Sequence, residues 1–323
     1  MQETVVQTNE HEQVPAVTYE KLTPIMAWQL AAPHTWPASI LPVLVAAAAA
    51  YANTGTLSVS MTLALLVICI LMQSSVNTFN DYFDYVKGSD SEEDNVEISD
   101  AVLVYNNVNP KAALALAVAF LAIAFAIGVY AIWYAGFIPL AIGVFGALIV
   151  VLYSGGKTPI SYLPIGELVS GFVMGGLIPL ACYYVLTLDF NMLALIWAAP
   201  SIIGVALIMM TNNTCDIEKD IAAGRSTLPV ILGRKRAASL YHALMVTWMA
   251  SISIIILIWF SRAAVTLPFM ILACYPLVLG LWKNPLIAQT RIGAMGQICS
   301  LNVALGAFYA LALFASSGIY VTL

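Results

Sequence analysis

Hydrophobic residues run through this chain in long stretches that contain no charged side chain. Residues 22–80 and 112–156 contain no Asp, Glu, Lys or Arg, and each stretch is long enough for two membrane-spanning helices. Turn-forming residues divide these stretches at Asn53-Thr-Gly55 and at Tyr134-Ala-Gly136. Five shorter charge-free stretches, each long enough for one helix, follow at 168–188, 190–215, 237–261, 263–282 and 292–323. The pattern therefore predicts nine membrane-spanning helices.

The composition supports a membrane-embedded chain and argues against other classes of protein. Hydrophobic residues make up 61% of the 323 residues and charged residues 9%, with a mean hydropathy of +0.91. An average soluble domain has about 25% charged residues, so this chain lacks the polar surface to cover a globule in water. A net charge of −5 does not suit nucleic acid, which needs a basic surface. The predicted fold class is an all-α integral membrane protein.

The ends and loops of the chain indicate its orientation. Residues 1–20 are polar and are expected to form a disordered tail ahead of a single membrane domain over 21–323. Residues 18–33 fit either a helix in the membrane interface, with Trp28 at headgroup depth, or a frayed start of the first span. With a cytoplasmic N-terminus, eleven Lys and Arg residues lie inside and only Arg262 lies outside. This bias predicts a multi-pass protein of the inner (plasma) membrane with its N-terminus in the cytoplasm.

Polar side chains gather where the second and the sixth predicted spans reach the cytoplasm. Asn and Asp residues recur there three and four positions apart, which places amides and carboxylates on one face of each helix. The first set consists of Asn77, Asn80, Asp81 and Asp84, and the second of Asn212, Asn213, Asp216 and Asp220. The sets lie four spans apart, which suggests an internal duplication and brings both to the same side of the membrane.

Two sets of carboxylates on one side of the membrane predict a cation site. Like charges this close repel one another unless cations lie between them, and oxygen ligands suit Mg²⁺, which favours one or two carboxylates plus substrate phosphates. A diphosphate held between the sets fits this pattern. Two other interpretations remain open: acids that cap helices in solvent, favoured for the acids of 92–100, and the cation pathway of a transporter. The middles of the spans, almost bare except for Gln73 and Asn302, weigh against the transporter.

These residues resemble a known family. Asn80-Asp-Tyr-Phe-Asp84, with Asp90, resembles the first Asp-rich motif of the UbiA superfamily of intramembrane prenyltransferases, and Asp216-Ile-Glu-Lys-Asp220 resembles the second. Further segments resemble the branch that prenylates 1,4-dihydroxy-2-naphthoate for menaquinone, namely Pro33-His-Thr-Trp-Pro-Ala38, Tyr153-Ser-Gly-Gly156 with Gly166-Glu167, and Gly224-Arg-Ser-Thr-Leu228 with Leu232-Gly233. The resemblance implies nine helices around a central cavity, with the cytoplasmic loops as a cap.

The resemblance also implies ligands for Mg²⁺ and for a polyprenyl diphosphate. One Mg²⁺ would be held by Asn77, Asn80, Asp81 and Asp84, and the other by Asn213, Asp216 and Asp220, with Asn212 behind them. Lys87 and Arg225 would neutralise phosphate oxygens, and their alternative role is solvation at the surface. Lys157, Lys219 and Lys111 are further cations that would compensate for the family cations that this chain lacks.

Three more residues are candidates for contact with the reacting groups. The ring of Tyr153 would face an allylic cation, although a place in the aromatic belt of the interface also explains this residue. Glu167 would orient Lys157 or an acceptor hydroxyl, or else it is an acid at a helix N-terminus. His34 would contact the acceptor ring, or else it lies at the interface. The catalytic set expected from the resemblance is Asp81, Asp84, Asp216, Asp220 and Tyr153.

The chain departs from the family pattern at three cationic positions. Ala32 stands where the family usually has Arg before Pro, and Cys215 stands where the branch has Arg before the second motif. The Gly-Pro-x-Arg stretch that usually follows the first motif is replaced by Val96-Glu-Ile-Ser-Asp100. These losses bear mainly on how the carboxylate of an acceptor is recognised.

The resemblance implies transfer of a polyprenyl group from its diphosphate to an aromatic acceptor, first of all 1,4-dihydroxy-2-naphthoate. Loss of diphosphate, assisted by Mg²⁺, leaves an allylic cation that an electron-rich ring attacks in a site closed to water. The same chemistry on 4-hydroxybenzoate or another aromatic acid is the alternative within this class. A transporter and a silent prenyl-lipid or quinone-binding protein are the alternatives outside it.

Overall fold

The computed structural model describes residues 19–88 and 101–316. The tail expected over residues 1–20 lies outside the described residues apart from Tyr19 and Glu20, and the solvent acids expected between 92 and 100 lie outside them as well. Within the described ranges the chain is helical, and its one isolated β-bridge joins Glu20 to Val108.

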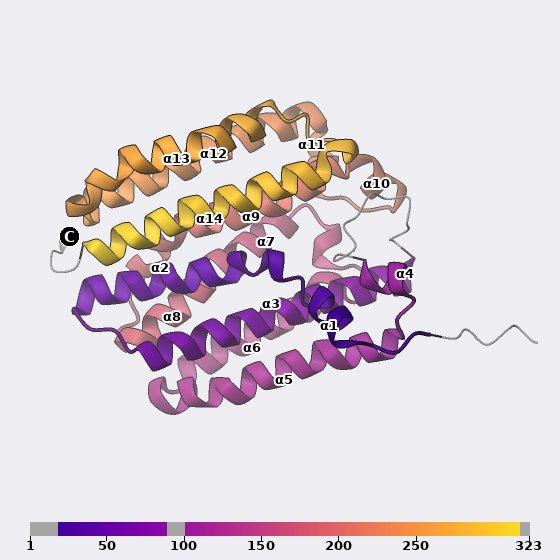
Figure 1. Ribbon diagram of the computed structural model, residues 1–323, viewed down its shortest axis with the longest axis horizontal. Helices are drawn as coiled ribbons and strands as arrows, with labels where there is room; N and C mark the ends of the chain where they lie inside the picture. Colours follow the sequence, from indigo (N-terminus) through magenta and orange to yellow (C-terminus); the bar gives the residue numbers. More distant parts are fainter. Residues whose placement is uncertain (1–18, 89–100, 317–323) are drawn as a thin grey trace, which may run out of the picture.

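Fourteen α-helices follow one another through the described residues (Figure 1). They are α1 (Pro24–Leu30), α2 (Pro37–Thr54), α3 (Val59–Lys87), α4 (Val102–Asn106), α5 (Pro110–Ala135), α6 (Phe137–Ser154), α7 (Gly166–Phe172), α8 (Ile178–Thr187), α9 (Leu193–Cys215), α10 (Ile217–Ala222), α11 (Leu228–Leu232), α12 (Arg234–Trp259), α13 (Thr266–Lys283) and α14 (Arg291–Ala315). A π-helical turn, Val173–Leu177, joins α7 to α8 and makes them one continuous span.

Nine helical segments of the described chain are long and apolar enough to cross a membrane, as the charge-free stretches predict. Gly55 ends α2 in the left-handed conformation at φ 68°, and Gly136 separates α5 from α6 at φ 80°. Both lie in the turn segments predicted from the sequence. The nine spans, and the multi-pass membrane protein that they define, are confirmed.

The segment before the first span folds as a helix of its own. Thr23 caps α1 by accepting a hydrogen bond from the backbone N–H of Met26, and Ala32 then takes the left-handed conformation at φ 45°. This break separates α1 from α2, so the segment is not a frayed extension of the first span. Trp28 of α1 is 59% exposed, while its ring packs edge-on against Trp36.

Helix α2 lies at the centre of the bundle. It packs against α3, α8, α9 and α14, and 67% of its membrane window is buried, against 17% for α5. The run Ala46–Ala50 explains this position, because methyl side chains let neighbouring helices approach closely in a membrane. The outer helices instead carry large exposed apolar side chains such as Trp133 and Phe137, which suit contact with lipid.

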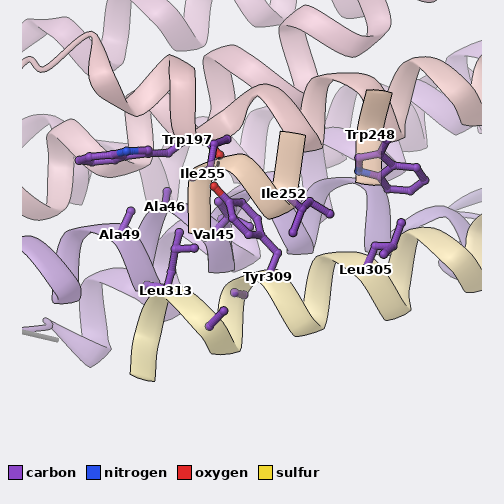
Figure 2. Close-up of a cluster of buried hydrophobic side chains, with 14 of the residues drawn as sticks. Val45, Ala46, Ala49, Trp197, Trp248, Ile252, Ile255, Leu305, Tyr309 and Leu313 are labelled. Carbon is purple, nitrogen blue, oxygen red and sulfur yellow. Dashed lines mark hydrogen bonds between the residues drawn. The ribbon is translucent and has the colours of Figure 1, made fainter. Parts of the chain in front are cut away.

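The core beside α2 joins helices that are distant in the sequence. Figure 2 shows Trp197 of α9, Ile255 of α12 and Tyr309 of α14 around Val45 and Ala46 of α2. The hydroxyl of buried Tyr309 donates a hydrogen bond to the carbonyl oxygen of Trp197 over 2.8 Å. The C-terminal helix is therefore fixed both to the centre of the bundle and to α9, which leads into the second polar set.

The π-helical turn packs unusually close to α9. A Cβ atom added to Gly175 would lie 2.5 Å from the Cα atom of Ile202, a distance at which the backbone itself must move. The methyl of Gly175→Ala is therefore expected to separate the turn from α9 and to lower the free energy of unfolding by about 1–3 kcal/mol.

This prediction is checked by the thermal midpoint of the purified protein in detergent. Gly296→Ala is the matched control, because a Cβ atom there meets nothing within 4 Å. Equal midpoints for the two variants would contradict the close packing of the turn.

Candidate active site

The two polar sets meet at one end of the bundle, near α4 and α10 (Figure 1). Arg225, in the connection between α10 and α11, joins them directly. Its Nη2 donates to Oδ1 of Asp84 over 3.1 Å, and its Nη1 lies 3.7 Å from Oδ1 of Asp220. One guanidinium therefore balances a carboxylate from each set, in a setting where the Arg225 side chain is only 16% exposed.

The first set lies in the last turns of α3, and Gly88 ends that helix in the left-handed conformation. Asp84 accepts a second hydrogen bond, at Oδ2, from the amide of Asn80 over 3.0 Å. The Asn80 oxygen in turn accepts from the hydroxyl of Ser154 over 2.7 Å. Lys87 donates to the carbonyl oxygen of Ser154 over 2.7 Å. The end of α6 therefore orients the polar end of α3.

Two members of the first set bond to other parts of the chain. The amide of Asn77 donates to the carbonyl oxygen of Ala31 over 3.0 Å and to the hydroxyl of Thr35 over 2.8 Å. Its oxygen accepts from the amide of Gln73 over 3.1 Å. Asn77 thus fastens α3 to the connection between α1 and α2, whereas the resemblance assigns it to a metal.

Asp81 is bonded to α4. Its Oδ2 accepts from the backbone N–H of Val102 over 2.7 Å, and its Oδ1 lies 3.4 Å from that of Leu103. These are the unpaired N–H groups of the first turn of α4, which a carboxylate stabilises. Asp81 is 4% exposed, and in this structure it anchors a helix of the connection that follows the first motif.

The second set is interrupted by a break in the helix. α9 ends at Cys215, Asp216 leaves helical geometry at φ −99° and ψ 17°, and α10 begins at Ile217. The continuous helical face expected for Asn212, Asp216 and Asp220 is therefore bent at its middle residue. The hydrogen bonds from the Asp216 N–H to the Asn212 carbonyl (3.1 Å) and from the Asp220 N–H to the Asp216 carbonyl (2.8 Å) still keep the three residues in succession.

A second arginine balances this set from α14. Arg291 is buried, and its Nε donates to Oδ2 of Asp216 over 3.0 Å while its Nη2 donates to the oxygen of Asn212 over 2.6 Å. Cys215, which stands where the related branch has Arg, is fully buried beside them. A guanidinium thus reaches the second set from another helix, although the residue before the motif carries no charge.

Burial shapes the electrostatics of the second set. Burial raises the pKa of Asp220 to about 6, although Arg225 and the hydroxyl of Thr227, which donates to Oδ2 over 3.0 Å, oppose this shift. Burial also raises the pKa of Asp216, against the opposing charges of Arg291 and Lys219. Both carboxylates therefore depend on nearby cations to stay ionised near neutral pH.

Glu167 lies beside Asn213, and the hydroxyl of Tyr153 lies close to Gly166, the neighbour of Glu167. The amide of Asn213 donates to Oε1 of Glu167 over 2.8 Å, while Oε2 of Glu167 and the hydroxyl of Tyr153 are buried without a partner among the described residues. Glu167 is 3% exposed and belongs to the first turn of α7. The arrangement places an acid and a phenol next to the second set, with hydrogen-bonding capacity that a ligand can use.

Other predicted residues lie further out. His34 and Lys157 are exposed, and Lys157 forms no ion pair with any residue of the described chain. Lys219 is half-buried in α10, where its charge acts on Asp216 and Asp220.

An apolar cavity of about 150 Å³ lies inside the bundle, and Gln73, whose amide donates to Asn77 of the first set, is among the residues that line it. It lies between α3, α5, α6, α8 and the π-helical turn. Val76, next to Asn77, lines it near the polar end, and Leu65 and Val185 line it toward the opposite end of the helices. Its walls are almost entirely hydrocarbon, which suits a linear apolar chain and not a charged ligand.

The residues present fit Mg²⁺ when it arrives with a phosphate ligand. Among the described residues no group of three or more His, Cys, Asp or Glu side chains is close enough to form a metal cage by itself. Mg²⁺ seldom needs such a cage, because it binds one or two carboxylates and completes its shell with water and substrate phosphates. Asp84 with Asn80, and Asp216 or Asp220 with Asn213, offer such partial sets.

Three residues of the site were not predicted from the sequence. Arg291, Ser154 and Thr227 reach the motifs from α14, α6 and the start of α11. Of the three, only Arg291 could have been predicted from the sequence, because it is the single charged residue in the long apolar stretch that follows Lys283. The hydroxyl residues carried none, because Ser and Thr are common at helix ends.

The fold and the site define a helical membrane protein in which two sets of acidic and amide side chains lie close together at one end of the bundle. The sequence profile of the UbiA prenyltransferase family matches residues 39–291, and the chain belongs to this family. As a member it is a prenyltransferase, which confirms the resemblance seen in the motifs.

Individual relatives agree with this assignment. The chain is 38% identical over 239 residues to the 1,4-dihydroxy-2-naphthoate octaprenyltransferase of Bacillus subtilis, which covers 73% of this chain and 75% of the relative. It is 27% identical over 280 residues to UbiA prenyltransferase domain-containing protein 1 of Ailuropoda melanoleuca, covering 86% and 80% of the two chains. The solved structure of a UbiA homolog from Archaeoglobus fulgidus bound to GPP and Mg²⁺ has the same fold, with a TM-score of 0.60 and 16% identity over 90% of this chain and 99% of that chain.

The different partners of Asp81 and Asp84 lead to a prediction. Asp81→Ala removes the acceptor for the first N–H groups of α4, so amide exchange in the segment 102–106 is expected to rise about fivefold, as for a lost helix cap of about 1 kcal/mol. Hydrogen–deuterium exchange followed by mass spectrometry of this peptide measures the effect.

Asp84→Ala is the matched control, because Asp84 bonds to Asn80 and Arg225 and to neither N–H group of α4. Unchanged exchange in Asp81→Ala, or an equal rise in both variants, would contradict the anchoring role.

Proposed function

We propose that the protein transfers a polyprenyl group from a polyprenyl diphosphate to an aromatic acid, with 1,4-dihydroxy-2-naphthoate as the acceptor and Mg²⁺ as the cofactor. The observation that carries this proposal is the pairing of Asp84 and Asp220 through Arg225 at the polar end of a bundle that also encloses an apolar cavity. Such a site offers both a cationic contact for a diphosphate and oxygen ligands for the cations that accompany it.

The diphosphate would bind among the cations of the two sets. Arg225 lies beside Asp84, and Lys87 lies at the end of α3. From these positions the N–H groups of both side chains can contact phosphate oxygens. Mg²⁺, when bound, supplies positive charge that makes diphosphate a better leaving group. Asn80, Asp84, Asn213, Asp216 and Asp220 are the residues proposed to hold it, while Asn77 and Asp81 support them through the connections they anchor.

The reaction itself would break the bond between C1 of the prenyl chain and the diphosphate oxygen, which keeps the electron pair. The ring of the acceptor then forms a bond to C1, and a proton is lost from that ring, or carbon dioxide where the attacked carbon carries the carboxylate. The ring of half-buried Tyr153, whose hydroxyl lies close to Gly166 at the start of α7, would stabilise the allylic cation. Glu167 would orient the acceptor hydroxyl through its unpaired oxygen.

The prenyl tail would occupy the apolar cavity between α3, α5, α6 and α8. Gln73 and Val76 of α3 line this cavity, so a chain bound by its diphosphate at the end of α3 would run back along α3 to reach it. Its hydrocarbon walls exclude water from the first isoprene units, which protects an allylic cation from hydrolysis.

The identity of the acceptor rests on relatives and on local sequence. The relative from Bacillus subtilis is named for 1,4-dihydroxy-2-naphthoate, and the segments around Pro33, Tyr153 and Gly224 resemble the same branch. Because Ala32 and Cys215 replace cations, Arg291 is the cation proposed to keep the second set positively balanced. With eleven cations on the side of the motifs, the site would face the cytoplasm in a bacterial inner membrane.

Turnover by the purified protein in nanodiscs tests the proposal. With labelled polyprenyl diphosphate and 1,4-dihydroxy-2-naphthoate, we expect prenylated product with Mg²⁺ and none with EDTA. Asp84→Ala and Asp216→Ala are each expected to reduce the rate at least a hundredfold, because each removes a carboxylate from one set. Diphosphate release only with 4-hydroxybenzoate would keep the reaction and replace the proposed acceptor. Absence of product with every aromatic acid would refute the proposed function.

Filling the apolar cavity should change the chain length that the enzyme prefers. Gly146 lies on the cavity wall, where an added Cβ would lie 3.5 Å from Cε of Met72. Gly146→Phe is expected to raise KM for an octaprenyl diphosphate about tenfold and to leave KM for geranyl diphosphate within twofold, because only the longer chain reaches the added ring.

Gly296→Phe, on α14 and outside the cavity, is the control and should leave both constants unchanged. An equal loss for long and short substrates in Gly146→Phe would contradict this placement of the tail.

A further inference from the structure

One aromatic ring lies under a cation from each half of the site. Tyr162 ends the 3₁₀ turn Ile160–Tyr162, in the connection between α6 and α7. The ammonium of Lys87 lies 4.9 Å from the centroid of its ring, and the guanidinium carbon of Arg225 lies 4.6 Å from the same centroid. Lys87 comes from the end of α3 and Arg225 from the connection after α10, so elements more than a hundred residues apart converge on this ring.

The backbone fixes the ring in place. The N–H of Ser226, the neighbour of Arg225, donates to the carbonyl oxygen of Tyr162 over 2.8 Å. The ammonium of Lys87 donates to the carbonyl oxygen of Ser154, at the end of α6. Tyr162 is therefore tied to the α10–α11 connection through its main chain, while both cations are held above its side chain.

The ring faces both cations without neutralising either, although Arg225 is also paired with Asp84 and Asp220. Two like charges brought to one place repel each other, and the negative face of an aromatic ring offsets part of that repulsion. A carboxylate would do the same but would also compete with an incoming anion. Among the described residues Lys87 forms no ion pair. Its ammonium donates to the carbonyl oxygen of Ser154 and lies over the rings of Tyr162 and Phe83, with Phe83 the more distant at 5.6 Å. None of these three contacts neutralises its positive charge.

We propose that Tyr162 is a positioning residue for the diphosphate: its ring sets the separation and direction of Lys87 and Arg225, so that both cations meet the same diphosphate group. This inference rests on the proposed function, because it assumes that a prenyl diphosphate is the anion bound here. It adds that the connection between α6 and α7 is part of the diphosphate site even though it contributes no charge.

The test compares variants that keep the ring with variants that remove it. Tyr162→Phe keeps the ring, Tyr162→Leu removes it, and Tyr162→Met is a second ringless variant of more flexible shape. Tyr275→Leu, an exposed tyrosine of α13, is the matched control. Binding of geranylgeranyl diphosphate in the presence of Mg²⁺ is measured by calorimetry, and KM for each substrate is measured by turnover.

We expect the ringless variants to raise the Kd and KM for the prenyl diphosphate at least tenfold, with KM for the aromatic acid within twofold of the native value. Tyr162→Phe should stay within threefold, and Tyr275→Leu should be unchanged. In a double-mutant cycle, Lys87→Met should reduce affinity for the prenyl diphosphate much less in the Tyr162→Leu protein than in the native protein, because the ammonium of Lys87 is already misplaced when the ring is absent.

Different failures separate the inference from the function beneath it. Native protein that binds and turns over prenyl diphosphate, with ringless variants of equal affinity, would overturn the role of Tyr162 and leave the function standing. Equal losses in Tyr162→Phe and Tyr162→Leu would also overturn it, because the hydroxyl and not the ring would then be responsible. Native protein that binds no prenyl diphosphate would overturn both.

Discussion

The site depends on the balance of buried carboxylates by arginines that come from other elements. Asp84, Asp216 and Asp220 all lie at helix ends where water is scarce, and removing ions from water is costly unless opposite charges replace it. Arg225 joins the two sets, and Arg291 fastens the second set to α14. The helices that carry the motifs are therefore held in register by the same charges that make the site able to receive an anion.

The sequence was sufficient for the parts of the fold that depend on solvent. Charge-free stretches predicted the nine spans because a charge in hydrocarbon is costly, and Gly55 and Gly136 marked turns that only flexible backbone makes easily. The two motifs were also visible, because acids and amides repeat at helical spacing. Their meeting at one end of the bundle followed from their places at the ends of the second and sixth spans, which are four spans apart.

Spacing alone did not reveal which neighbours each side chain would find. Asn77 and Asp81 share a helical face with Asp84, yet they bond to the chain before α2 and to α4, since those segments pack there only in the folded molecule. The break at Asp216 and the approach of Arg291 depend likewise on contacts between distant helices. The position of Tyr162 could not be predicted, because the sequence around a single tyrosine in a loop does not show whether cations lie over its ring.

The alanine-rich face of α2 has a mechanical consequence. The short methyl side chains of α2 pack closely and leave no layer of long, flexible side chains between it and its neighbours. These neighbours include helices from both ends of the chain. Helices from both ends of the chain therefore pack against one shared axis, which disfavours a rocking motion of one half of the bundle against the other. We expect substrates to enter and leave without a rearrangement of α2 against its neighbours.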